Sequence, residues 1–169
     1  MMDHRGLSAV ATAVTLLLQR SWIAGDIDGA APEFVVYRSR DFADPMHTGL
    51  SVFVHQVSGA PLLRDLPRAN APRQSVVSVE VSFLLTAWAE SASVEQSLLG
   101  WGACTLADNP VLDATLLNDA VPGVCAPGET IQLRADDSDQ PVSQLWQAIP
   151  CTMQLSLPYI TSALHLATG

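Results

Sequence analysis

The sequence predicts a single α/β (α+β) domain with a mixed sheet of four to five strands covered by helices. The run from Val76 to Trp88 is β-branched, aliphatic or aromatic, lacks Gly and Pro, and is typical of a strand. A segment with helical spacing follows it and ends at Asp108-Asn109-Pro110. Extended and helical segments alternate along 169 residues, a length that suits one hydrophobic core, so residues 1–169 are expected to form one domain.

The predicted strand changes character along its length. Up to Glu80 and Ser82 it alternates apolar and polar residues, whereas Phe83 to Ala89 is apolar at nearly every position. Alternation indicates one solvated face, and a continuous apolar run indicates burial on both faces. We therefore expect the strand to start near the surface and to end inside the core.

The following helix has two candidate N-caps, Ser91 and Ser93, between which the sequence does not choose. Glu95 in the first turn suits the positive end of the helix dipole. Apolar residues share one broad face, so the helix is expected to lie on the sheet. These residues are Val94, Leu98, Leu99, Trp101, Gly102 and Leu106.

The N-terminal segment has the outline of a signal peptide, because Arg5 precedes the apolar run Leu7 to Leu18. Polar residues nevertheless recur in it at steps of three and four, which predicts an amphipathic helix that packs on the domain. A segment of this length is also too short to span a membrane. The polar stripe consists of Ser8, Thr12, Thr15 and Gln19.

The remaining elements are predicted from composition and from Gly and Pro residues, which mark the ends of strands and helices. Strands are expected at Glu33–Tyr37, Leu50–Val57 and Thr130–Leu133, and loops at 38–49 and 59–72. The type of Val111–Asn118 is left open. A helix with Pro141 in its first turn is expected to end at Pro150, with Asp139 or Gln140 as its cap. The closing segment Thr152–Leu166 reads as extended, and Pro158 predicts a bend or an edge strand there.

The charge composition excludes several classes of function. The chain carries 8 basic and 17 acidic residues, a net charge of -9, and all its basic residues are Arg. Such a chain is not expected to bind nucleic acid or to insert into a membrane. The absence of Lys removes the phosphate-binding P-loop and Schiff-base chemistry.

The candidate reactive residues do not form a recognisable site. Cys104, Cys125 and Cys151 are too far apart for a zinc site, and Cys104 is expected to be a small buried residue within its helix. Gly100-Trp101-Gly102 imitates a dinucleotide-binding turn, but it lies in mid-helix, where two glycines favour close approach to the sheet. The acidic turn Asp136–Asp139 resembles half of a calcium-binding loop, without its central Gly and distal Glu. Capping of the following helix and solvation of the turn explain these acidic residues equally well.

No catalytic set, cofactor or metal is therefore expected, and the chain is predicted not to be an enzyme. The four His residues show no metal-ligand spacing, and no Ser lies in a nucleophile elbow. A triad assembled only in space is an alternative that sequence leaves open.

Aromatic and charged residues outside the predicted core are candidates for an interface. Leu84, Trp88, Leu98, Trp101 and Trp146 are expected to share one core, whereas Trp22 follows the first helix and is the better candidate for an exposed contact. In the proline-rich 59–72 segment, Arg64 and Arg68 suit acidic partners. The candidate interface set is Trp22, Leu62, Leu63, Arg64, Arg68, Asp136, Asp137 and Asp139.

Several segments, taken in order, resemble a known family. They are the first helix, the strand 50–57 with the following Pro61-Leu62-Leu63-Arg64-Asp65, the runs Leu84–Ala89 and Leu98-Leu99-Gly100, Pro110-Val111-Leu112, Ser143–Trp146 and Leu155–Tyr159. Together they are similar to the N-terminal domain of the cap or tail-terminator proteins of extracellular contractile injection systems, which are phage-tail-like particles of the antifeeding-prophage type. The resemblance spans nearly the whole chain.

The resemblance implies a tail-terminator-like fold and a structural, non-enzymatic role. Such a protein closes the baseplate-distal end of the sheath and inner tube as a homo-hexameric ring, with the sheath and inner-tube proteins as partners. It is assembled in the cytoplasm and belongs to a particle that is released. Members often carry a further C-terminal region that these 169 residues do not match, so only the terminator role is carried over. The alternative is a small hydrolase or ligand-binding domain whose site the sequence does not reveal.

Overall fold

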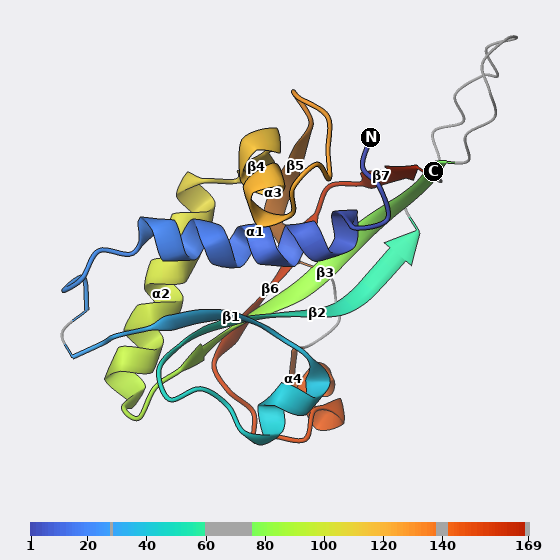
Figure 1. Cartoon of the computed structure of the whole chain (residues 1–169). Helices are drawn as coiled ribbons and strands as arrows, with labels where there is room; N and C mark the ends of the chain where they lie inside the picture. The colour runs from blue at the N-terminus through green and yellow to red at the C-terminus, as the bar shows by residue number, and fades with distance from the viewer. Residues whose placement is uncertain (28, 60–75, 138–141, 168–169) are drawn as a thin grey trace, which may run out of the picture.

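The computed structural model describes residues 1–27, 29–59, 76–137 and 142–167, which form an α+β fold around a curled, mixed sheet (Figure 1). The helical elements are α1 (Gly6–Ser21), the 3-10 helix η1 (Ser39–Ala43), α2 (Ala92–Asp108), α3 (Ala114–Ala120) and α4 (Val142–Ala148). The strands are β1 (Glu33–Tyr37), β2 (Gly49–Gly59), β3 (Val76–Trp88), β4 (Val111–Asp113), β5 (Thr130–Ala135), β6 (Ser156–Thr161) and β7 (Leu164–Ala167).

The sheet has seven strands in the described residues, rather than the four to five that the sequence predicted. Its order is β1-β2-β3-β6-β5-β4, and β7 pairs with β3 beside β6. Only the β1–β2 pair is parallel. The prediction missed β4, which has only three residues and leads directly into α3. It also merged β6 and β7 into one segment.

Side-chain hydroxyls separate β6 from β7. The Oγ1 of Thr161 accepts a hydrogen bond from the backbone N–H of Val81 at 3.0 Å, and the Oγ of Ser162 accepts one from the N–H of Gln132 at 3.0 Å. These bonds replace strand-to-strand backbone bonds at the junction. The chain then continues along the same side of β3, where β7 pairs with Val76–Val79.

Pro158 lies neither at a bend nor in an edge strand, contrary to the prediction. It is inside β6, paired with Leu84 of β3, and its carbonyl oxygen accepts a hydrogen bond from the N–H of Asp136 at 2.9 Å. The nitrogen and carbonyl of a strand residue point to the same side, so the missing N–H of Pro158 faces the point where β5 has just ended. The proline therefore removes no bond between β6 and β3.

Strand β3 has the predicted bounds and organises both layers of the core. Every residue from Val81 to Trp88 is buried. Because side chains alternate across a strand, the odd-numbered residues from Val79 to Ala87 face α1 and α2, whereas Leu84 and Trp88 face η1 and α4. Ser78 and Ser82, which were expected to be solvated, are also buried.

Helix α2 lies on the sheet with the predicted face inward, and Leu98, Leu99 and Leu106 are buried. Ser91 is the N-cap, since its side chain accepts a hydrogen bond from the N–H of Val94 at 3.2 Å. Cys104 is exposed on the outer side of this helix, which corrects the expectation that it is buried.

Gly102 is the glycine that permits close packing of α2 on the sheet. A Cβ atom there would lie 2.7 Å from Leu50 Cδ1 and 3.3 Å from Leu85 Cδ2. A Cβ at Gly100 would meet nothing within 4 Å, so the close-approach interpretation holds for Gly102 and not for Gly100.

The five residues expected to share one core belong to two clusters on opposite faces of the sheet. Leu98 and Trp101 pack in the larger cluster under α1 and α2, while Leu84, Trp88 and Trp146 pack in a smaller one. The expectation failed because Leu84 and Trp88 lie on the face of β3 opposite α2, the helix that directly follows it. The smaller cluster is closed by aromatic contacts of Phe42, Tyr37, Phe53, Trp88 and Trp146.

The second face also carries a row of three hydroxyl side chains across three strands, of which Ser51 and Thr86 are buried. Ser51 pairs with Thr86, and Thr86 pairs with Ser156. Trp88 donates its indole N–H to the Oγ of Ser51 at 2.8 Å, and Trp146 donates to the Oγ of Ser156 at 3.0 Å. The Thr86 Oγ1 between them is buried without a hydrogen-bond partner.

The N-terminal segment covers the edge near β7. Met2 forms bridges to both Cys125 and Leu166, and the N–H of Ala167 donates to the carbonyl of Met2 at 2.8 Å. Helix α1 then crosses the domain and contacts α3, β1 and β2, as expected for an amphipathic helix packed on the domain (Figure 1). Within the described ranges, no helix has the length and apolar character needed to cross a bilayer.

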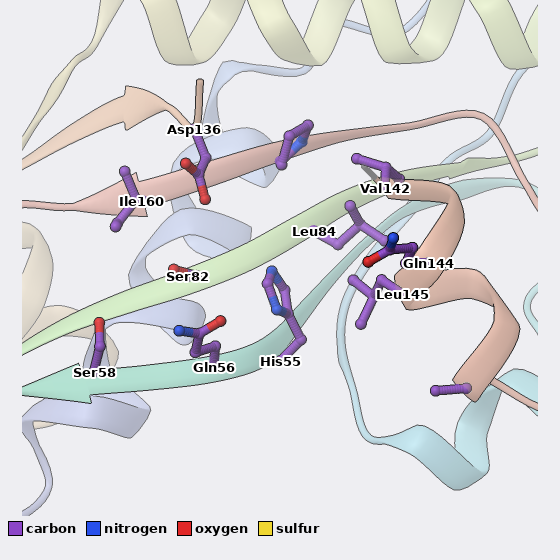
Figure 2. Close-up of a pocket in the computed structure, with 12 residues that line it drawn as sticks. His55, Gln56, Ser58, Ser82, Leu84, Asp136, Val142, Gln144, Leu145 and Ile160 are labelled. Atoms are coloured by element: carbon purple, nitrogen blue, oxygen red, sulfur yellow. The ribbon is translucent and has the colours of Figure 1, made fainter. Parts of the chain in front are cut away.

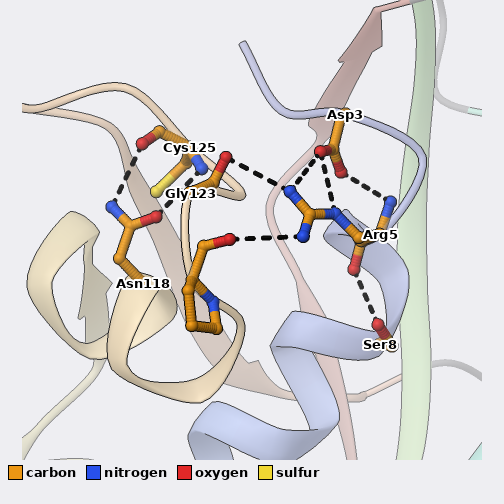
Figure 3. Close-up of polar contacts among 7 residues, drawn as sticks. Asp3, Arg5, Ser8, Asn118, Gly123 and Cys125 are labelled. Carbon is orange, nitrogen blue, oxygen red and sulfur yellow. Dashed lines mark hydrogen bonds and ion pairs between the residues drawn. The ribbon is translucent and has the colours of Figure 1, made fainter.

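Polar contacts fix the N-terminal segment to the connection between α3 and β5 (Figure 3). The Arg5 guanidinium binds the Asp3 carboxylate at 2.7 Å and reaches the carbonyl oxygen of Gly123 at 3.4 Å. Asn118 forms two hydrogen bonds with the backbone of Cys125, at 3.1 and 3.3 Å. The irregular connection is thus held by side chains on both sides.

Two hydroxyls of this row, those of Ser51 and Thr86, are expected to differ in their response to removal. Ser51→Ala leaves the indole N–H of Trp88 buried and unpaired, which should lower the free energy of unfolding by about 1–3 kcal/mol. Thr86→Val removes a hydroxyl that has no partner and keeps the side-chain shape, so stability should be unchanged or higher. Urea denaturation of both variants measures the difference. An equal loss in both would show that Thr86 has a hydrogen-bond partner in solution.

The two glycines of α2 provide a second matched pair. Gly100→Ala should stabilise the protein by up to about 1 kcal/mol, since alanine is the better helix former and the position is open. Gly102→Ala must displace the buried Leu50 side chain, so it should be less stable than Gly100→Ala by about 1–3 kcal/mol. Thermal and urea denaturation of the two variants test this, and equal stability would contradict the close packing at Gly102.

Candidate functional site

A β-bulge in β2 borders a pocket between α4 and the sheet. Val54 pairs with Phe83 and Gln56 pairs with Ser82, so His55 is an extra residue between them. An extra residue breaks the alternation of side chains and redirects one of them. His55 and Gln56 consequently both line the pocket on the face of the sheet that α4 covers (Figure 2).

The pocket has a volume of about 410 Å³ and lies between α4 and the sheet. Helix α4 supplies one wall, and β2, β3 and β6 supply the floor. Half of the polar lining residues come from β2, and the apolar ones come from α4, β3 and β6. The lining residues are His55, Gln56, Ser58, Ser82, Leu84, Asp136, Val142, Gln144, Leu145, Ala148, Pro158 and Ile160.

His55 is the unusual group in this pocket. Its side chain is partly buried, and its Nε2 atom is buried without a hydrogen-bond partner. Burial lowers the pKa of the imidazole below its usual value, and the negative charge of Asp136 offsets part of that effect. The imidazole is therefore neutral at pH 7.

The pocket contains the residue types of a hydrolytic triad but not its hydrogen bonds. Ser82, His55 and Asp136 all line it. A serine nucleophile is activated by a hydrogen bond to its base, and the Nε2 of His55 makes no hydrogen bond. Among the described residues, the Nε2 of His55 is therefore not part of a preformed nucleophile–base pair.

The described residues contain no cluster of side chains that could coordinate a metal ion. There, His, Cys, Asp and Glu side chains do not gather in groups of three that could hold one. Asp137 is exposed and lies 3.7 Å from Arg134 of the same chain, so part of the acidic turn forms an ion pair within the domain. Gly100 and Gly102 lie inside α2, where they form no phosphate-binding turn.

The residues of the candidate interface have different positions. Trp22 is partly buried and packs edge-on against Trp101 at 5.0 Å, which corrects the expectation of an exposed side chain. The neighbouring Ile23 is exposed instead, at 69 %. Asp136 lines the pocket and Asp137 is at the surface. Leu62, Leu63, Arg64, Arg68 and Asp139 lie outside the described residues.

The surface also exposes two apolar stretches that sequence reasoning did not nominate. On the edge strand β1, Val35 and Val36 are 37 % and 38 % exposed. Immediately before and within β6, Met153, Leu155 and Leu157 are 61, 42 and 37 % exposed. The two stretches are separated in the sheet by β2 and β3.

Sequence reasoning missed His55, although a signal was present. Leu50, Val52 and Val54 repeat at intervals of two, and the next apolar residue, Val57, follows after three. Val57 pairs with Val81, whose side chain faces the helices, so the apolar pattern returns to the same face one residue late. Such a slip in an otherwise regular strand indicates a bulge.

The lowered pKa of His55 predicts a pH dependence of stability. In the unfolded chain the imidazole binds a proton as the pH falls through about 6.5. In the folded state its pKa is lower, so it binds the proton only at a lower pH. The contribution of His55 is therefore complete above about pH 6.5 and is lost as the pH falls below it. The free energy of unfolding should decline less from about pH 7.5 to about pH 5 in His55→Gln than in the parent chain.

His47→Gln is the matched control, because the His47 side chain is 92 % exposed. Its pH dependence, measured by urea denaturation across the same range, should follow that of the parent chain. A parental slope in His55→Gln would show that His55 is not desolvated.

Comparisons with known proteins place this fold. Among curated proteins, none matches significantly. The chain is similar in structure to the sheath/tube terminator, in its extended state, of the extracellular contractile injection system PVC. The TM-score is 0.65 with 15 % identity, over 96 % of this chain and 56 % of that one. It is also similar to the tube-terminating cap of the anti-feeding prophage. There the TM-score is 0.62 with 16 % identity, over 95 % of this chain and 54 % of that one.

The chain thus spans about half the length of these solved chains. The family model of the Pvc16 N-terminal domain matches residues 9–168. This match covers nearly the whole sequence and confirms the resemblance found in its segments. The chain belongs to the Pvc16 N-terminal domain family.

Proposed function

We propose that this chain is a structural cap that closes the baseplate-distal end of the sheath and inner tube of a contractile injection system. The observation that carries the proposal is the family membership over residues 9–168. The two solved structures described above support it, because one is a sheath/tube terminator and the other a tube-terminating cap. The sheath and inner-tube proteins are the proposed partners, and the role is assembly rather than catalysis.

The proposed assembly is a homo-hexameric ring. A ring repeats one heterologous contact, so each copy needs two different patches. The apolar stretches on β1 and at 153–157 are different from each other and lie on different strands, which suits such a contact. Ile23, beyond the end of α1, offers a third exposed apolar side chain.

The acidic charge of the chain agrees with proteins, rather than nucleic acid or membranes, as its partners. A net charge of -9 disfavours nucleic acid and anionic membranes as partners. We place assembly in the cytoplasm, before the particle is released. The alternative of a ligand-binding domain retains one specific observation in its favour, the pocket at His55.

The proposed interface residues can be tested in particles. In cells that produce the particle, reversing both Arg64 and Arg68 to Glu in the full-length protein should lower the fraction of sheaths that end in a cap. The physical reason is lost pairing with acidic side chains of a neighbouring subunit. Exposed pairs contribute about 1 kcal/mol or less each, so the defect should be partial and stronger at low salt.

The measurement is a count of capped and uncapped sheaths by electron microscopy, with the melting temperature of the isolated domain as the control for folding. Arg40→Glu is the matched charge reversal at an exposed position in η1. Normal capping in the double variant would remove Arg64 and Arg68 from the interface. Normal capping after deletion of the whole protein would overturn the proposed function.

A further inference from the structure

We propose that two copies of this chain pair through the open edge of β1, antiparallel about a two-fold axis at Val35, so that their sheets join into one. The inference does not depend on the capping role. A two-fold contact closes after two copies, so the pair is a state of the free chain and is distinct from the contact of the proposed ring. It follows from the backbone pattern, the length and the composition of this edge.

Alternate residues of β1 point their backbone groups away from β2. The N–H of Glu33 donates to the carbonyl oxygen of Thr48 at 3.0 Å. In the parallel register of β1 and β2, every second residue from Glu33 onward therefore bonds to β2. The N–H and C=O groups of Phe34 and Val36 consequently point outward, and β1 is the last described strand on this side of the sheet (Figure 1).

Two features limit the open edge to these two residues. Before it, Pro32 has no N–H to offer. After it, the next outward N–H, that of Arg38, donates to the Oδ2 of Asp41 at 2.7 Å. The open groups of the two residues, two donors and two acceptors, are thus placed symmetrically about Val35.

The composition of β1 does not protect this edge against pairing. Natural edge strands are protected by Lys, Pro, a bulge, a very short length or a covering segment. Strand β1 has the sequence EFVVY, with one charged residue at its start, and both Val35 and Val36 are exposed. The other described edges differ, because β4 has only three residues and Met2 bridges Leu166 of β7. Among the described edges, β1 is therefore the one that a further strand can extend.

A second copy of the chain supplies a strand that matches this edge. With Val35 opposite its own counterpart, Phe34 of one copy faces Val36 of the other copy, and the two exchange both backbone hydrogen bonds. The same exchange occurs on the other side of the axis, so the outward groups of both residues find partners. The side chains also agree, because an aromatic residue opposite a β-branched one is a favourable pair. Each Glu33 faces Tyr37 rather than the other Glu33, so like charges do not meet.

The pair should be weak. A pairing of five residues per copy buries far less than the roughly 1,200 Å² of a stable interface, so a Kd of about 100 µM is expected. The measurement is sedimentation equilibrium of the 169-residue chain at concentrations from about 10 µM to about 1 mM. The average mass should rise from that of one copy toward that of two.

A single backbone N–H separates strand pairing from other contacts of β1. Val36→Pro removes an N–H that points outward, so the sheet within the chain loses no hydrogen bond, and an edge strand tolerates proline at such a position. It should weaken dimerisation at least about tenfold, with little change in melting temperature. Val36→Thr is the matched control, because it keeps both the N–H and the branched shape, and it should dimerise like the parent chain.

Cysteine cross-linking tests the register. In a Cys104→Ser chain, which lacks the exposed native thiol, Val35→Cys places two thiols opposite each other, with Cα atoms about 4.5 Å apart across the axis. Mild oxidation should link these copies at least about tenfold faster than Glu33→Cys, whose two Cα atoms would lie roughly 14 Å apart. No rise in mass up to about 1 mM, parental dimerisation of folded Val36→Pro, or equal cross-linking at positions 33 and 35 would each overturn the proposal.

Discussion

The burial of β3 on both faces is the constraint on which the rest of the structure depends. A strand that is buried from Val81 to Trp88 needs a layer on each side. Helices α1 and α2 supply the larger layer, while η1 and α4 supply the smaller one with Phe42 and Trp146. The aromatic residues of the smaller layer are anchored by Ser51 and Ser156, which take the two indole N–H groups. Loss of either layer would expose one set of alternate β3 side chains.

The candidate site results from the same constraint. Helix α4 covers the Trp88 end of the second face, and the pocket opens beside it, where β2 carries the bulge. The bulge also keeps both ends of β2 in register with β3, because Val52 and Val57 face the same side although they are five positions apart. One inserted residue thus serves the packing of β2 on β3 and turns His55 toward α4.

Local patterns predicted the elements whose burial is set by neighbours in sequence. The bounds of β1 and β3 agree with prediction, and α2 ends at the Asn109-Pro110 signal. The predictions that were wrong concern features set by contacts between residues far apart in the sequence. The split of β6 from β7 depends on hydroxyl bonds to Val81 and Gln132, and the two-core arrangement depends on which face α4 occupies. His55 was missed because a single histidine in a strand has no motif, although the slipped spacing from Val54 to Val57 marked the bulge.

The contacts of the proposed ring depend on the surface of this chain itself. At 15–16 % identity the fold is shared while most side chains differ, so surface patches cannot be transferred from the solved relatives. The charges of this chain also argue that apolar contacts dominate. Asp137 already pairs with Arg134 of its own domain, so a neighbour's arginine must compete with that pair, and exposed pairs are weak. The affinity of a ring would then come from exposed apolar side chains such as Ile23, Val36 and Met153, with charged loops setting the register.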